Sequence, residues 1–188
     1  MVNDFTNRIK ITEISQSPEW SPKRKHMTLN SFIAKTSEEK RYKEYISEHL
    51  DDWYLFFGAP GTGKTHLSTA IAKAQWEKDK MKEVKVVKFR YIGAEVREDF
   101  AREREVIKLY SNVDILIIEE VGKGYNSEFE IQLLFDIIDT RDEYSKQTII
   151  TTNMTQSEFV KLIGKPTASR LLSIATPVIL TGKDHRQG

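Results

Sequence analysis

One stretch constrains this chain more than any other: Gly58-Ala59-Pro60-Gly61-Thr62-Gly63-Lys64-Thr65. It fits the pattern G-x-x-x-x-G-K-[ST], in which glycines let backbone N–H groups converge on phosphate oxygens without Cβ clashes. The apolar run 53–57 before it is typical of a buried strand, and residues 66–76 after it carry apolar side chains at helical spacing. A strand, a glycine-rich loop and a helix in this order are the setting that a phosphate-binding loop (P-loop) requires.

The P-loop predicts a nucleotide site. We expect the Lys64 ammonium group to contact the β- and γ-phosphates and the Thr65 hydroxyl to bind Mg²⁺. The complete set of predicted nucleotide-binding residues is Gly58, Ala59, Pro60, Gly61, Thr62, Gly63, Lys64, Thr65 and His66.

A second nucleotide signature is Asp114-Ile115-Leu116-Ile117-Ile118-Glu119-Glu120, an apolar run that ends in two carboxylates. It is typical of a central parallel strand with acids at its C-terminal end, which is where open α/β sheets bind ligands. We expect Glu119 to hold Mg²⁺ through water and Glu120 to polarise the attacking water. The alternative is a buried strand followed by surface acids.

The remaining chain alternates between strand and helix patterns. Helices are predicted after Thr36 or Ser37, over residues 94–110, 127–143 and 157–163, and from Pro166 onward; strands are predicted over 84–92, 147–152 and 177–180. This order predicts an α/β fold with a doubly wound, parallel, five-stranded sheet. Residues 29–188 are expected to form this domain. Residues 1–28, polar and interrupted by Pro18 and Pro22, are expected to form an arm that is either flexible or docks a partner.

Composition excludes several classes of protein. The 188 residues carry a net charge of +1, so no overall field attracts the chain to nucleic acid. The absence of cysteine excludes disulfides and cysteine-based zinc modules, and it fits a cytoplasmic protein. No apolar run approaches a membrane span, so we expect no membrane partner.

A local basic stripe is expected within the predicted helix 94–110, whose apolar positions are Val96, Phe100, Ile107 and Tyr110. Its cations are Arg97, Arg102, Arg104 and Lys108. Acidic residues are interleaved with them, so the alternatives are a solvated, ion-paired face and a surface that contacts nucleic acid phosphates.

The segments GAPGTGKTHLSTAIA, ILIIEE, TIITTN and SRLLS together resemble the AAA+ ATPases of the DnaC/DnaI type. These are loaders of the replicative DNA helicase, and the IstB-like transposition helpers are close relatives. The resemblance implies no separate helical lid, ATP and Mg²⁺ as ligands, and self-association into an ATP-dependent oligomer. It also implies that the replicative helicase and single-stranded DNA are partners, with the basic segment contacting the DNA.

The resemblance also implies roles for single residues. Glu119 and Glu120 match the two acids of the Walker B motif, and Asn153 matches the sensor that orients the attacking water. Arg170 matches the arginine finger that each subunit offers to the ATP of its neighbour, so hydrolysis is expected to be slow and to depend on assembly or DNA.

Two departures from the family leave other functions open. Glu119 stands where the family usually has Asp, and the larger N-terminal domain of many loaders is missing from this sequence. The alternatives to a helicase loader are therefore an IstB-like, ATP-dependent DNA-binding transposition helper and a non-hydrolysing, nucleotide-dependent interaction module.

Overall fold

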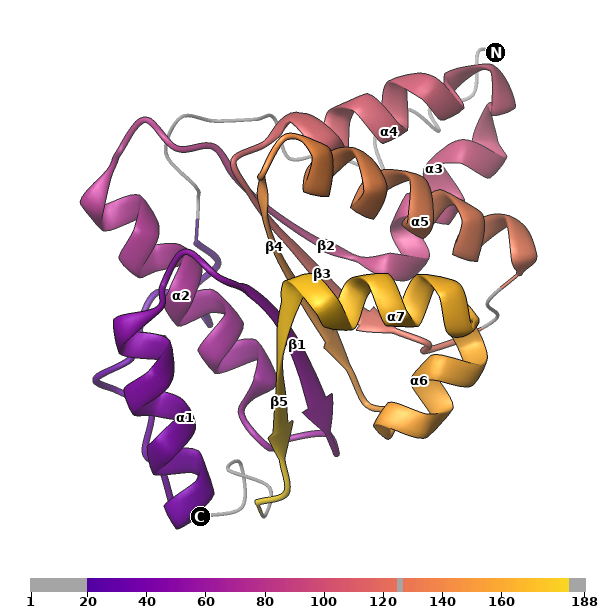
Figure 1. Cartoon of the computed structure of the whole chain (residues 1–188). Coiled ribbons are helices and arrows are strands. Elements are labelled where there is room, and N and C mark those ends of the chain that lie inside the picture. The colour runs from indigo at the N-terminus through magenta and orange to yellow at the C-terminus, as the bar shows by residue number, and fades with distance from the viewer. Residues whose placement is uncertain (1–19, 125–126, 183–188) are drawn as a thin grey trace, which may run out of the picture.

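The computed structural model describes residues 20–124 and 127–182. Its strands form one parallel sheet in the order β2-β3-β4-β1-β5 (Figure 1). The strands are β1 (Trp53–Gly58), β2 (Val84–Lys88), β3 (Ile115–Val121), β4 (Gln147–Thr152) and β5 (Ala175–Leu180). Because all strands run the same way, the C-terminal ends of β1, β3 and β4 meet at one edge of the sheet, where ligands are expected.

Helices cover both faces of the sheet, as a doubly wound fold requires (Figure 1). One layer holds α1 (Ser37–Glu48) and α2 (Lys64–Lys78). The other holds α3 (Phe89–Glu98), α4 (Glu103–Asn112), α5 (Glu128–Glu143), α6 (Gln156–Ile163) and α7 (Lys165–Ile174). The predicted fold class is confirmed, and the described residues form no separate lid domain. None of the described helices is long and apolar enough to span a membrane.

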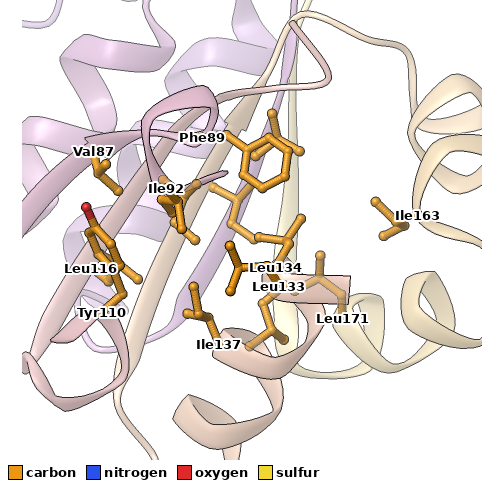
Figure 2. Packing of buried hydrophobic residues seen from close by; sticks show 14 of the residues in the cluster. Val87, Phe89, Ile92, Tyr110, Leu116, Leu133, Leu134, Ile137, Ile163 and Leu171 are labelled. Atoms are coloured by element: carbon orange, nitrogen blue, oxygen red, sulfur yellow. The ribbon is translucent and has the colours of Figure 1, made fainter. Parts of the chain in front are cut away.

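Two apolar clusters hold these layers to the sheet. Successive strand residues point to opposite faces, so Tyr54 and Phe56 join the cluster under α1 and α2, whereas Leu55 and Phe57 join the other. Figure 2 shows the second cluster, in which side chains of α3, α5 and α7 pack together beside the sheet. The uninterrupted apolar runs of β1 and β3 follow from this burial on both faces.

Three of the helices begin at a side chain that caps the first turn. The hydroxyls of Thr36, Ser127 and Thr155 each accept a hydrogen bond from the backbone N–H of the third helical residue. That residue is a glutamate in all three helices, and its carboxylate accepts a hydrogen bond from the backbone N–H of the cap residue. Pro166 lies in the first turn of α7, as predicted.

The predicted strand 84–92 is too long. β2 ends at Lys88, and Phe89 begins α3. The valines of β2 (Val84, Val86 and Val87) run directly into the helical stripe of α3, in which Phe89, Ile92 and Val96 are buried on one side.

The predicted single helix 94–110 is also wrong, because the chain breaks at Asp99. The Asp99 side chain accepts a hydrogen bond from the Ala101 N–H at 3.0 Å and caps a short 3₁₀ turn, η1 (Phe100–Arg102), before α4. Phe100, expected on the apolar stripe, is 63% exposed. It contacts the Phe129 ring edge-on.

The predicted basic stripe is consequently divided among three elements. Arg97 lies on α3, Arg102 in η1, and Arg104 and Lys108 on α4. Arg97 donates to the buried Glu130 carboxylate of α5 at 2.5 Å, and Arg102 pairs with Glu105 at 3.4 Å. These cations therefore do not form one helical face, and contact with nucleic acid stays a prediction.

The predicted N-terminal arm is described only from residue 20. Residues 20–28 form turns without a helix or strand, and they lie against α2. Residues 1–19 lie outside the described residues, so the predicted domain boundary at residue 28 stays a prediction.

Arg141, on α5, joins two loops to the sheet. Its guanidinium is fully buried and donates to backbone carbonyls before β3 and at the start of β4, and to one hydroxyl. The acceptors are the carbonyl oxygens of Tyr110, Ser111, Val113, Asp114 and Gln147 and the hydroxyl of Thr148. A guanidinium has five N–H donors in a fixed plane, so no other side chain can satisfy so many acceptors at once.

Replacing Arg141 with Ala should lower the free energy of unfolding by about 3 kcal/mol or more, since several buried carbonyls lose their donor. Urea denaturation followed by circular dichroism measures this loss. Arg41→Ala, at an exposed position of α1, is the matched control and should change stability by at most about 0.5 kcal/mol. An equal effect of the two substitutions would contradict the role of Arg141.

Candidate nucleotide-binding site

The P-loop connects β1 to α2 through two glycines in backbone conformations that other residues rarely adopt. Gly58 has φ +143°, and a Cβ there would lie 2.3 Å from the Leu180 carbonyl oxygen. Gly63 has φ +99° and caps α2, and a Cβ there would lie 2.6 Å from the Phe32 ring. The loop therefore packs tightly on β5 and on the segment before α1, and its conformation requires glycine.

Lys64 begins α2 and is held by the loop itself. Its ammonium group donates to the carbonyl oxygens of Gly58 and Ala59 at 2.6 and 2.7 Å. The Thr62 hydroxyl also donates to the Ala59 carbonyl, at 2.9 Å. A positive charge and the first N–H groups of α2 thus lie together, which is an arrangement that attracts phosphate.

A cavity of about 480 Å³ opens over the P-loop. This volume is within the range of small-molecule and cofactor sites. It is lined by Lys23, Met27, Ser31, Phe32, Ile33, Pro60, Gly61, Gly63, Lys64, Thr65, His66, Glu120, Lys123, Thr151 and Asn153. The cavity therefore brings together the end of the P-loop, the acid after β3 and the residue after β4, which lie far apart in the sequence.

Of the predicted nucleotide-binding residues, those from Pro60 onward line the cavity, except Thr62. Gly58, Ala59 and Thr62 instead form the loop itself. His66 lines the cavity and also makes two polar contacts with the segment before α1. Its Nε2 lies 2.9 Å from the Thr28 carbonyl oxygen and 3.2 Å from the Ser31 hydroxyl. It therefore also anchors the segment that precedes α1.

The direction of the Glu119 side chain follows from the alternation of side chains along β3. Ile115 and Ile117 face α2, so two residues further the Glu119 side chain faces α2 as well, and it is only 4% exposed. Arg24 donates to Glu119 Oε2 at 2.7 Å and to the Thr69 hydroxyl of α2 at 2.6 Å. A carboxylate buried to this extent needs such a cation.

Glu119 is not among the residues that line the cavity, but the groups around it suit Mg²⁺. Glu119 Oε1 is buried and has no hydrogen-bond partner among the described residues, although a buried carboxylate oxygen normally has one. Thr65, the predicted hydroxyl ligand, lines the cavity. The described residues contain no cluster of three or more acidic or histidine side chains, so Mg²⁺ held here would take its other ligands from phosphate and water, as it commonly does.

Glu120 has a different environment because the strand bulges. The pairing of β3 with β4 shifts register between Ile118 and Val121, and Glu120 has φ +59°. A non-glycine residue in this conformation costs about 1–3 kcal/mol and is concentrated at functional sites. The distortion brings Glu120, which strict alternation would turn to the opposite face from Glu119, to the cavity.

Two lysines flank the Glu120 carboxylate. Lys123 donates to Oε1 at 3.0 Å, and the Lys88 ammonium lies 3.5 Å from Oε2. Burial raises the pKa of Glu120, but the hydrogen bond from Lys123 and the charge of Lys88 outweigh it and hold this pKa below its usual value. Glu120 is thus a carboxylate at neutral pH, able to accept a hydrogen bond from water.

Asn153 and Arg170 occupy different places. Asn153 follows β4 and lines the cavity, where an amide can orient a ligand or water. Arg170 lies on α7, does not line the cavity, and pairs with Asp139 and Asp142 of α5. A role for Arg170 in its own subunit's site is not supported, and a role at a neighbouring subunit stays a prediction.

Sequence reasoning missed the cations that surround the two acids. Arg24 lies in a segment without regular structure, and its contact with Glu119 joins residues 95 positions apart. Lys88 was missed because its neighbourhood depends on strand pairing: β2 pairs with β3 in a register that places Lys88 beside Glu119. That register follows only from the strand order, which the sequence does not contain.

The comparison with known proteins identifies the family. Residues 41–174 match the family described as IstB-like ATP binding protein. The chain belongs to this family. It is an AAA+ ATP-binding domain related to the DnaC and DnaI helicase loaders, as the sequence motifs predicted.

Relatives of two kinds resemble this IstB-like chain. The replicative helicase loader DnaC of Escherichia coli (strain K12) is 29% identical over 139 residues, which cover 72% of this chain and 56% of DnaC. A putative ATP-binding protein of insertion sequence IS232 from Bacillus thuringiensis subsp. berliner is 29% identical over 147 residues, covering 70% and 54%. The chain thus spans about half the length of these relatives.

Solved structures show the same fold. The crystal structure of the DnaC helicase loader has a TM-score of 0.76 at 21% identity and covers 86% of this chain and 100% of that one. A structure of DnaA from Aquifex aeolicus, bound to AMPPCP, has a TM-score of 0.72 at 21% identity, covering 88% and 53%. These likenesses establish an AAA+ fold.

Replacing Lys123 with Gln should raise the pKa of Glu120, because the carboxylate loses its hydrogen-bonding cation while burial continues to favour the neutral form. NMR titration of the Glu120 side-chain carboxyl measures this shift. Lys40→Gln, on the exposed side of α1, should leave the midpoint where it is in the wild type. An unchanged Glu120 midpoint in Lys123→Gln would contradict the assigned pairing.

Proposed function

We propose that this protein is an ATP-dependent loader that places the replicative DNA helicase on single-stranded DNA when replication begins. The observation that carries the proposal is the combination of a P-loop cavity with 29% identity to the replicative helicase loader DnaC over most of the chain. The family supplies ATP binding, and AAA+ proteins of this family are generally ATPases.

The proposed reaction uses the side chains at the cavity. The triphosphate binds the N–H groups at the start of α2, and Lys64 leaves the carbonyl oxygens of Gly58 and Ala59 to contact the β- and γ-phosphates. Thr65, and Glu119 through water, would hold Mg²⁺, and the bound metal would neutralise the charge that develops on the phosphates. Glu120 and Asn153 orient the attacking water.

Arg170 completes the site from a neighbouring subunit in this proposal. It is half-exposed on α7 and outside its own cavity, so it is available to a second copy of the chain once its ion pairs with Asp139 and Asp142 exchange. ATP then favours an assembly that engages DNA and the helicase, and hydrolysis releases it.

Lys64→Ala should weaken ATP binding about 10- to 100-fold, since a charged hydrogen-bond donor to phosphate is lost. Titration with a fluorescent ATP analogue measures the affinity, and circular dichroism checks that the fold is retained. Lys78→Ala, at the exposed end of the same helix, is the control and should bind as the wild type does. Undiminished affinity in Lys64→Ala would overturn the assignment of the site.

Arg170→Ala should bind ATP normally but lose about 10³-fold or more in turnover under assembling conditions, which is the typical contribution of an arginine finger. Asp142→Asn disrupts the same ion pair but keeps the guanidinium, so it should retain turnover. Normal turnover by Arg170→Ala would remove this residue from the catalytic set.

The second candidate is an ATP-dependent transposition helper, which the family description and the insertion-sequence relative favour. Light scattering of the protein mixed with the replicative helicase of its source, with and without Mg²⁺ and ATP, separates the two. A stoichiometric complex that depends on ATP supports the loader. No complex in any nucleotide state, together with tighter binding to bent duplex than to single-stranded DNA, supports the helper.

A non-hydrolysing module is the third candidate, motivated by Glu119 in place of the usual Asp. A single-turnover assay with excess protein and single-stranded DNA tests it. We expect ADP to form in the wild type and not in Glu120→Gln. Absence of ADP in the wild type, with ATP still bound, would favour the module.

A further inference from the structure

The segment before α1 forms hydrogen bonds with side chains along one side of α2. His66, Thr69 and Lys73 are spaced three and four residues apart, so they lie on the same side of the helix. His66 Nε2 meets the Thr28 carbonyl oxygen, the Thr69 hydroxyl accepts from Arg24, and Lys73 donates to the Lys25 carbonyl at 2.7 Å. We call residues 20–32 the docked segment.

Most of these contacts are ordinary hydrogen bonds. Arg24 differs because it also contacts Glu119, the acid that is proposed to hold Mg²⁺. It is bound to Glu119 Oε2 at 2.7 Å, and both side chains are largely removed from water. Thr69, its other partner, lies one helical turn beyond Thr65, the predicted Mg²⁺ ligand, on the same side of α2. The docked segment therefore places a cation next to the position that the metal would occupy.

Two cations that share one buried carboxylate weaken each other's binding. The charge of Glu119 attracts Mg²⁺ less when Arg24 already neutralises it, and it holds Arg24 less when Mg²⁺ is present. The repulsion between guanidinium and metal acts in the same direction. By linkage the effect is reciprocal. Arg24 weakens the binding of Mg²⁺ by the same free energy by which bound Mg²⁺ weakens the docking of the segment.

We propose that Arg24 is a tethered cation that competes with Mg²⁺ for Glu119, so that metal binding loosens the docked segment from α2. It rests on the proposed binding of nucleotide and Mg²⁺ at this cavity. The consequence is a switch built into the fold: binding of the metal releases residues 20–32 from this side of α2.

The length of the Glu119 side chain fits this arrangement. Strand β3 fixes the backbone of Glu119, and one oxygen of the side chain contacts Arg24 while the other has no hydrogen-bond partner among the described residues. Shortening it by one methylene in Glu119→Asp moves the oxygen by about an ångström, which is enough to break a hydrogen bond of 2.7 Å.

The test uses the full chain with a non-hydrolysable ATP analogue, and Mg²⁺ is the titrated probe. Affinity for the analogue is first measured without metal, so that a failure of the nucleotide site itself is recognised separately. Arg24→Gln should then bind Mg²⁺ about tenfold more tightly than the wild type, a coupling of ordinary size. Lys25→Gln removes an equal charge from the same segment, but its side chain is exposed, so it should leave the Mg²⁺ affinity within about twofold of the wild type.

Hydrogen exchange gives the second readout, which does not depend on catalysis. In the wild type, Mg²⁺ added to the analogue complex should accelerate amide exchange in residues 23–32. In Arg24→Gln this exchange should already be fast without metal and should not respond to it. An Mg²⁺ affinity that is unchanged or weaker in Arg24→Gln, or exchange in the wild type that Mg²⁺ leaves unchanged, would overturn the proposal.

Discussion

The concentration of peptide N–H groups and positive charge at the start of α2 is the constraint on which the rest of the site depends. Gly58 and Gly63 are required because the loop packs against the Leu180 carbonyl oxygen and the Phe32 ring, where a Cβ does not fit. The parallel sheet then brings the ends of β3 and β4 to the same edge. Glu120 and Asn153 therefore line the same cavity as the start of α2.

Two neighbouring carboxylates beside a phosphate site are electrostatically unfavourable, and the chain separates them by environment. Glu119 is buried on the α2 face and has Arg24 as its cation. Glu120 is turned to the cavity by a bulge and has Lys88 and Lys123. The first carboxylate has one oxygen without a hydrogen-bond partner in the described part of the chain, which suits a metal. The second carboxylate is kept ionised, which suits the orientation of water.

Local patterns predicted most of the fold and the residues of the P-loop, because a glycine loop between an apolar strand and a helix leaves few alternatives. The family and its AAA+ fold followed from four short motifs and are confirmed. Local patterns failed at 84–110, where the alternation of β2 merges with the apolar stripe of α3 and Asp99 starts a new turn. They could not find Arg24 or Arg141, since these arginines act through contacts that only the tertiary structure creates.

The central claim is that the start of α2 binds the triphosphate of ATP, and a crystal structure with Mg²⁺ and a non-hydrolysable ATP analogue tests it most directly. We predict that the β- and γ-phosphates lie within hydrogen-bond distance of the N–H groups of residues 61–65. We also predict that the Lys64 ammonium has moved from the carbonyl oxygens of Gly58 and Ala59 to the phosphates. A triphosphate bound elsewhere, or a Lys64 that keeps both carbonyl contacts, would contradict the claim.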